Sequence, residues 1–179
     1  NSFDYWEYNS EFDPTRCPIY YIPTMRVDRR ASEDDMRMLW LKLDQIAAKR
    51  TDRKGIVQTI SFLRQGDVVR SSRFAAHMLV NAQGEAPTRM LEQFYRSGPG
   101  TILVSPSVGA GYDFAGTAAE WQFICKLPFP PPSKILKART EDDKEYPYYL
   151  TMNKFCQIVG RLMRSKGDRG ESFIADEHC

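Results

Sequence analysis

Short runs of β-branched and aromatic residues alternate along the chain with stretches whose apolar residues recur at helical spacing. The clearest helix begins after Ser32, a plausible N-cap with Asp35 three residues later, and its apolar positions continue to about Lys49. A short helix is expected after residue 61, whereas the polar stretch 134–144 is expected to be a surface loop. The remaining expected elements are strands at 18–22, 55–61, 77–80, 101–105, 121–127 and 171–175, and helices at 87–95 and 148–164.

This alternation of strands and helices predicts an α/β fold with a mostly parallel sheet that is covered by helices on both faces. We expect one domain over residues 1–179, because no linker, repeat or low-complexity tract divides the chain. Ligands in such folds bind at the carboxyl ends of the strands. The loops that follow Ser61, Ser105 and Leu127 are therefore the first places to look for a site.

Composition excludes several classes of protein. With 42% hydrophobic residues, the 179-residue chain is too apolar for a disordered protein. Lysine and arginine number 25 against 23 acidic residues, which argues against a broad basic face but allows a narrow basic groove. No apolar run approaches the roughly 20 residues that span a bilayer. The start of the chain has neither Met nor an apolar leader, so we expect a processed or excised piece without a signal peptide.

The cysteines and histidines are too scattered to predict a metal site. They are Cys17, Cys125, Cys156, Cys179, His77 and His178. A closed zinc site needs four ligands, usually in close pairs, and no C-x-x-C is present. Cys125 and Cys156 have apolar neighbours and are expected to be buried thiols. Reduced cysteines favour an intracellular location, in the cytoplasm or the nucleoid or nucleus.

The most informative segment runs from Gln157 to Gly170. On a helix of 3.6 residues per turn it would carry an apolar stripe and, roughly 130° around, a polar one. The apolar stripe, expected to pack on the sheet, is Met152, Cys156, Val159 and Met163, and the polar stripe is Gln157, Arg161 and Arg164. Gly160 leaves room beside the arginines, whose forked guanidinium groups are well shaped to hold phosphate oxygens. The alternative is a solvated helix face, because the helix dipole also favours basic residues near a C-terminus.

Two further segments place small and polar residues at strand ends. After the strand that ends at Ser105, a loop that includes Ser107 and Gly111 would expose backbone N–H groups able to contact phosphate. Asp113 in the same loop could accept from a hydroxyl or orient an arginine. Thr59 and Ser61 put two hydroxyl groups at the end of another strand, which by itself is ordinary turn chemistry.

A nucleotide cradle is absent from the sequence. No G-x-x-x-x-G-K-[ST] occurs anywhere in the sequence. Arginines that can grip an anion without such a cradle amount to half of an active site.

These segments, in this order, resemble the second motor domain of superfamily-2 DNA helicases of the DEAH type related to XPD and DinG. The family's motif VI reads Gln-x-x-Gly-Arg-x-x-Arg-x-x-x-Asp-x-Gly. Every fixed position is matched, by Gln157, Gly160, Arg161, Arg164, Asp168 and Gly170. Residues 105–113 are similar to motif V, with Ala110 where many relatives have Glu, and residues 54–61 to motif IV, with Gln58 where His is common. Residues 121–130, 12–14 and 19–23 also resemble the family, so the likeness covers nearly the whole chain.

The resemblance implies a three-layer RecA-like domain, with residues 1–17 leading into it, that works against a first motor domain. That partner carries the Walker A lysine and the acids, and ATP with Mg²⁺ lies in the cleft between the two. Arg164 is then the arginine finger, and Arg161 grips the same phosphates. The expected nucleotide-binding residues are Gly111, Asp113, Gln157 and Gly160.

The resemblance also implies a track for single-stranded DNA. Its phosphates would meet hydroxyl and backbone groups at the carboxyl ends of the strands, which position the strand without reading sequence. The residues expected on this track are Thr59, Ser61, Ser105 and Ser107. The isolated domain is expected to be inactive. Two alternatives remain open: a stand-alone RecA-like module that binds nucleic acid or protein without hydrolysis, and a free-standing phosphoesterase or kinase, which the missing Walker A motif disfavours.

Overall fold

The computed structural model describes residues 7, 12–28, 30–59, 61–106, 112, 114 and 116–177. In this part of the chain, six parallel strands form one sheet in the order β1-β6-β5-β2-β4-β3. The strands are β1 (Ile19–Met25), β2 (Gly55–Gln58), β3 (Met78–Leu79), β4 (Ile102–Ser105), β5 (Trp121–Ile124) and β6 (Glu171–Asp176). The helices are α1 (Glu33–Ala47), α2 (Phe62–Ser71), α3 (Thr88–Arg96), α4 (Lys134–Asp142) and α5 (Tyr146–Val159), with 3-10 turns η1 (Pro14–Arg16), η2 (Ala75–His77) and η3 (Gly160–Leu162).

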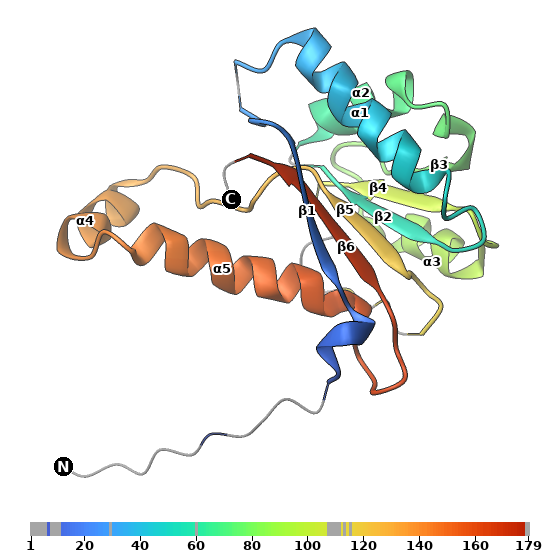
Figure 1. The fold of residues 1–179 in the computed structure, drawn as a ribbon. Coiled ribbons are helices and arrows are strands. Elements are labelled where there is room, and N and C mark those ends of the chain that lie inside the picture. The colour runs from blue at the N-terminus through green and yellow to red at the C-terminus, as the bar shows by residue number, and fades with distance from the viewer. Residues whose placement is uncertain are drawn as a thin grey trace.

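Helices cover both faces of the sheet, as the alternating pattern predicted (Figure 1). On one face, α1 and α2 bury their apolar sides against strand residues such as Val57, Val104 and Phe123. On the other face, α3 packs over β2 and β4, and the second half of α5 packs over β5 and β6. The neighbouring residues Ile56 and Val57 point to opposite faces, because side chains alternate along a strand. The expected three-layer α/β architecture with a parallel sheet is confirmed.

Helix α1 forms where the sequence predicted it. The Ser32 hydroxyl accepts from the backbone N–H of Asp35 at 3.1 Å, and the Asp35 carboxylate accepts in return from the Ser32 N–H at 3.1 Å. This capping box satisfies N–H groups that a helix start leaves unpaired. The helix ends at Ala47, close to the expected end.

Helix α4 and strand β1 differ from the expectation. Residues 134–142 form helix α4 and not a loop, and the Ser133 hydroxyl caps it by accepting from the Leu136 N–H at 3.0 Å. None of its residues is buried, so it lacks the apolar stripe on which the prediction relied. Strand β1 continues through Pro23 to Met25, with a register shift after Tyr21. An edge strand tolerates proline because one side of it needs no hydrogen-bond partner.

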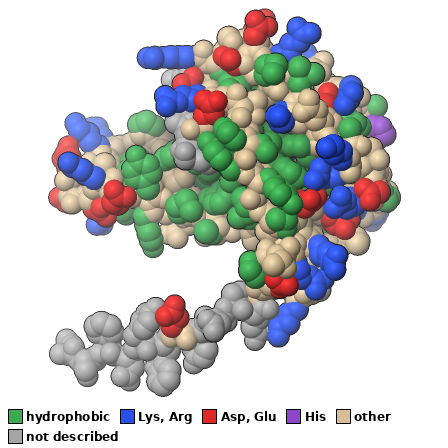
Figure 2. All heavy atoms as spheres, in the orientation of Figure 1, with side chains coloured by type: hydrophobic (Ala, Val, Ile, Leu, Met, Phe, Trp, Pro, Cys, Tyr) green, Lys and Arg blue, Asp and Glu red, His purple; other side chains and the backbone are tan. Residues whose placement is uncertain are grey.

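Helix α4 and the first half of α5 project beyond the sheet (Figure 1). Tyr148, Tyr149 and Met152 on α5 are exposed, as are Ile19 to Tyr21 on β1. Figure 2 shows apolar side chains gathered over β1 and α5 on this face, with charged groups around α4. None of the helices in the described ranges is long and apolar enough to cross a membrane.

Candidate functional site

The motifs occupy opposite ends of the sheet. Thr59, Ser61 and Ser105 lie at the carboxyl ends of β2 and β4, where sequence reasoning placed the site. Helix α5 runs back across the sheet, and the loop after η3 enters β6 at its first residue, Glu171 (Figure 1). The arginines of motif VI therefore lie near the amino ends of the strands. Gly116, which follows motif V in the chain, lies at this same edge, because its N–H donates to Asp168.

A buried carboxylate organises the motif VI loop. Asp168 Oδ2 accepts from the backbone N–H groups of Arg164 and Ser165, both at 2.7 Å. Its Oδ1 accepts from the Ser165 hydroxyl at 2.7 Å and from the Gly116 N–H at 3.2 Å. These hydrogen bonds, above all that from the Ser165 side chain, hold the pKa of Asp168 below its usual value. Asp168 thus joins the turn that carries Arg164 to the end of the segment that carries motif V.

The two arginines have different surroundings. Arg161 is buried, and its Nη1 donates to the backbone carbonyl of Tyr112. Arg164 is exposed, three residues further on. The expectation that both side chains project from one stripe of a continuous helix is wrong, because the α-helix ends at Val159 and η3 follows with a tighter turn.

The expected packing face of α5 was also misplaced. Its buried residues are Thr151, Phe155, Ile158 and Val159. Met152 and Cys156 are exposed, so Cys156 is not the buried thiol that its apolar neighbours suggested, whereas Cys125 is fully buried. Burial in an apolar site raises the pKa of the Cys125 thiol. In the described ranges no group of three or more His, Cys, Asp and Glu residues could hold a metal ion.

The two glycines of motif VI serve different purposes. A Cβ on Gly160 would meet nothing within 4 Å, so the surrounding structure does not require glycine there. A Cβ on Gly170 would lie 2.5 Å from Cβ of Leu162, which is closer than real Cβ contacts. Gly170 is therefore needed for packing, whereas Gly160 leaves open space next to Arg161, as the sequence argument supposed. Gln157, one turn earlier on α5, is exposed.

At the carboxyl edge, the hydroxyl-bearing residues take part in local hydrogen bonds. The Thr59 N–H donates to the Ser105 carbonyl at 3.2 Å, and both residues are buried. Thr59 Oγ1 has no hydrogen-bond partner among the described residues. Ser61 is the N-cap of α2 and accepts from the Arg64 N–H at 3.3 Å. Their proposed contacts with DNA stay a prediction.

Ser107, Gly111 and Asp113 fall outside the described residues.

A buried polar network on the α5 face of the sheet was not predicted from the sequence. Gln58 Nε2 donates to Gln122 Oε1 at 3.0 Å, and Gln122 Nε2 donates to the Ser172 hydroxyl at 2.9 Å and to the Ile158 carbonyl at 3.3 Å. Gln122 and Ser172 are completely buried. The available signal was a glutamine inside the otherwise apolar run Trp-Gln-Phe-Ile of β5.

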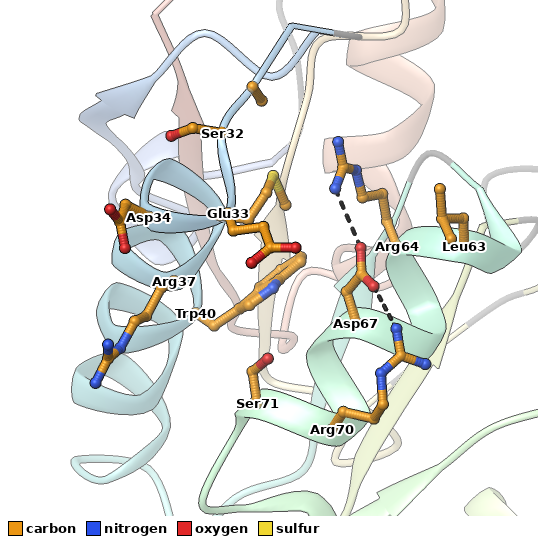
Figure 3. Close-up of a pocket in the computed structure, with 12 residues that line it drawn as sticks. Ser32, Glu33, Asp34, Arg37, Trp40, Leu63, Arg64, Asp67, Arg70 and Ser71 are labelled. Atoms are coloured by element: carbon orange, nitrogen blue, oxygen red, sulfur yellow. Dashed lines mark hydrogen bonds and ion pairs between the residues drawn. The ribbon is translucent and has the colours of Figure 1, made fainter.

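A groove of about 660 Å³ lies between α1 and α2, on the opposite face of the sheet (Figure 3). The Asp67 carboxylate on its α2 wall pairs with Arg64 at 3.1 Å and with Arg70. Trp40 from α1 lines it and is itself buried. Motif VI packs with α3 on the other face, so the groove is separate from the arginines.

Comparison with known proteins identifies the family of this chain. Residues 52–179 match the family described as "Helicase C-terminal domain". The chain belongs to this helicase family. It is 34% identical over 116 residues to the ATP-dependent DNA helicase YoaA of Haemophilus influenzae, an alignment that covers 58% of this chain and 18% of that protein. The chain therefore spans less than a fifth of the length of this relative.

The fold has counterparts among solved structures. A structure titled "XPD_APO" superposes with a TM-score of 0.65 at 17% identity, over 90% of this chain and 35% of that one. The structure of S. tokodaii Xpd4 gives a TM-score of 0.59 at 16% identity, over 88% and 33%. At these identities the likeness concerns the fold, and it agrees with the expected RecA-like architecture of a helicase motor domain.

Proposed function

We propose that this chain is the second motor domain of an ATP-dependent DNA helicase of superfamily 2, and that it contributes an arginine finger and part of the single-stranded DNA track. The observation that carries the proposal is the Asp168 carboxylate. By accepting from Arg164 and Ser165 of motif VI and from Gly116 after motif V, it fixes the turn from which the exposed Arg164 side chain extends. The relative YoaA, which is named as an ATP-dependent DNA helicase, supports this assignment.

The substrate is ATP with Mg²⁺, held mainly by a first motor domain. No Walker A sequence occurs in this chain, so phosphate binding and metal coordination must come from that partner, of the DEAH type. Whether the partner belongs to the same polypeptide does not change the chemistry. The site proposed here is accordingly one wall of a cleft in an intracellular enzyme, and the isolated domain is inactive.

The arginines stabilise charge during transfer of the γ-phosphoryl group. Negative charge spreads over its oxygens in the transition state, and a positioned guanidinium lowers the barrier by neutralising it. Arg164, exposed on a fixed turn, takes this role. Arg161 stiffens motif V through Tyr112 and contributes a second positive charge. Gly111, Asp113, Gln157 and Gly160 complete the nucleotide-facing surface.

Nucleic acid binds at the other edge of the sheet. Thr59, Ser61, Ser105 and Ser107 lie at the ends of β2 and β4 in the sequence, and their hydroxyl or backbone groups contact phosphates without reading bases. The net charge of only +2 is compatible with a narrow polar track of this kind.

ATP hydrolysis by the full-length protein, with and without single-stranded DNA, tests the proposal. Arg164→Ala should lower DNA-stimulated turnover by about 10³-fold or more, because a missing arginine finger costs about that much. Arg169→Ala is the matched control, since Arg169 is an exposed arginine of the same loop outside the fixed motif positions. The domain alone should not turn over. Hydrolysis by the domain alone would point to an unrecognised catalytic site within it, and full activity of the Arg164 variant would overturn the arginine-finger role.

A further inference from the structure

The fully buried amide of Gln122 has no role in the proposed chemistry. Its strand, β5, nevertheless lies between β6, which follows motif VI, and β2, which leads into the proposed DNA track. Gln122 on β5 is directly opposite Ser172 on β6, and both side chains point toward α5. Gln58, the last residue of β2, reaches it from the other side. Thr59 of the proposed DNA track follows Gln58 immediately in the chain, and Ser61 lies two residues further on.

The orientation of this amide is fixed by its partners. The Ile158 carbonyl can only accept, so the Gln122 nitrogen faces α5 and its oxygen faces Gln58. Both nitrogen-bound hydrogens are used, one by Ile158 and the other by Ser172.

The contact on α5 falls where the α-helix gives way to the 3-10 turn. The Ile158 carbonyl accepts from the Gly160 N–H as well as from Gln122. Arg161 lies one residue beyond this point, and Arg164 three residues further. The sheet therefore holds the last turn of α5 by a directional bond, in addition to the apolar packing of Ile158 and Val159.

Stability alone does not call for an amide here. Replacing hydrogen-bonded polar groups by apolar groups of the same shape in a core is often nearly neutral, and apolar packing lacks direction. A hydrogen bond to one carbonyl, in contrast, sets the height and rotation of the helix end. Small displacements of a catalytic group cost far more in rate than in stability.

We propose that Gln122 is a positioning residue for the motif VI arginines, and that Gln58 orients it from the strand that leads into the DNA track. This inference rests on the proposed function. It assigns to the Gln58–Gln122 pair the task of keeping Arg161 and Arg164 at a fixed height relative to the sheet.

The test uses Gln122→Met in the full-length protein, because methionine keeps the volume and removes both hydrogen-bonding groups. At saturating ATP and single-stranded DNA, kcat should fall about tenfold, with the Kd for DNA unchanged. In an Arg164→Ala background the same substitution should change single-turnover rates less than twofold, because the residue acts through the arginine. Gln58→Met should act in the same direction more weakly.

Gln65→Met is the matched control. Gln65 is also a buried glutamine that donates to a backbone carbonyl, that of Asn81 at 2.8 Å, but it lies on α2 on the other face of the sheet from α5. Its substitution should leave kcat within twofold of the unmodified protein. Amide hydrogen exchange should become faster at residues 158–162 in Gln122→Met and stay unchanged there in Gln65→Met.

An unchanged kcat, unchanged exchange at residues 158–162, or an equal loss in the Arg164→Ala background would each overturn the positioning role while leaving the proposed function standing. If the unmodified protein shows no DNA-stimulated hydrolysis, or Arg164→Ala keeps full activity, the proposed function fails and the positioning role fails with it.

Discussion

Gly116 donates its backbone N–H to the carboxylate of Asp168, 52 positions later in the chain, at 3.2 Å. The same carboxylate holds the N–H groups of Arg164 and Ser165. One side chain thus determines how the segment after motif V and the loop of motif VI fit together, although neither segment belongs to a helix or strand at that point.

Asp168→Asn should destabilise the domain by about 1.5–3 kcal/mol, the usual contribution of hydrogen bonds to a charged group. Asparagine keeps the shape but offers one acceptor in place of two charged oxygens. Denaturant unfolding measures the difference. Asp142→Asn, at an exposed position on α4, is the control and should change the free energy of unfolding by less than about 0.5 kcal/mol.

The same carboxylate predicts a pH dependence. Because its pKa is lower in the folded than in the unfolded state, the folded protein binds fewer protons, and Asp168 stabilises the fold above the unfolded pKa of about 3.9. That stabilisation is lost as the pH falls through the folded pKa. Unfolding measured from pH 6 down to pH 3 should show a shallower decline for Asp168→Asn than for the unmodified chain. Parallel curves would contradict this assignment.

The two motif VI glycines should respond oppositely to alanine. Gly170→Ala forces a Cβ against Leu162 and should destabilise the domain by about 1–3 kcal/mol. Gly160→Ala has open space and a φ of −65°, so it should leave the midpoint unchanged or raise stability by up to about 1 kcal/mol. Thermal unfolding of the two variants distinguishes them. If the nucleotide-facing role is correct, Gly160→Ala nevertheless loses ATP turnover in the full-length protein.

Thr59→Val separates structure from nucleic-acid binding. Because the buried Thr59 hydroxyl has no hydrogen-bond partner in the described part of the chain, replacing it by a methyl group should leave stability unchanged or raise it by up to about 1–3 kcal/mol. A contact to a DNA phosphate would cost about 2–10-fold in affinity when it is lost, which corresponds to one hydrogen bond. Fluorescence anisotropy with labelled single-stranded DNA measures this on the full-length protein. A clear loss of stability with intact affinity would show that the hydroxyl is structural.

The sheet and its helices could be predicted because burial alternates with a clear period along most of them. Helix α1 shows the regularity best, since the cap at Ser32 and the apolar spacing after it agree. Helix α4 escaped because it buries nothing. The spacing of apolar residues predicts only helices that bury one side. It cannot reveal a helix such as α4, which is stabilised by its cap and by contacts with a neighbouring helix.

The candidate site could be proposed from the sequence as a set of residue types, but its geometry could not. The motif spacing made Arg161 and Arg164 the candidates, but extending an ideal helix through Gly160 put both on one exposed stripe. The change to a 3-10 turn buries one and exposes the other. The role of Asp168 as the organiser of the loop, and the link through Gln122, depend on contacts between distant segments that spacing cannot express.

The close approach of Gly170 to Leu162 has a practical consequence for genetics. Under the proposed function, alanine at Gly170 and alanine at Arg164 would both lower the activity found in cells, for different reasons. The first would act by reducing the amount of folded protein, and the second would leave a normal amount of protein that does not turn over. Immunoblots of cellular abundance, compared with ATP hydrolysis in the same cell extracts, would separate the two causes.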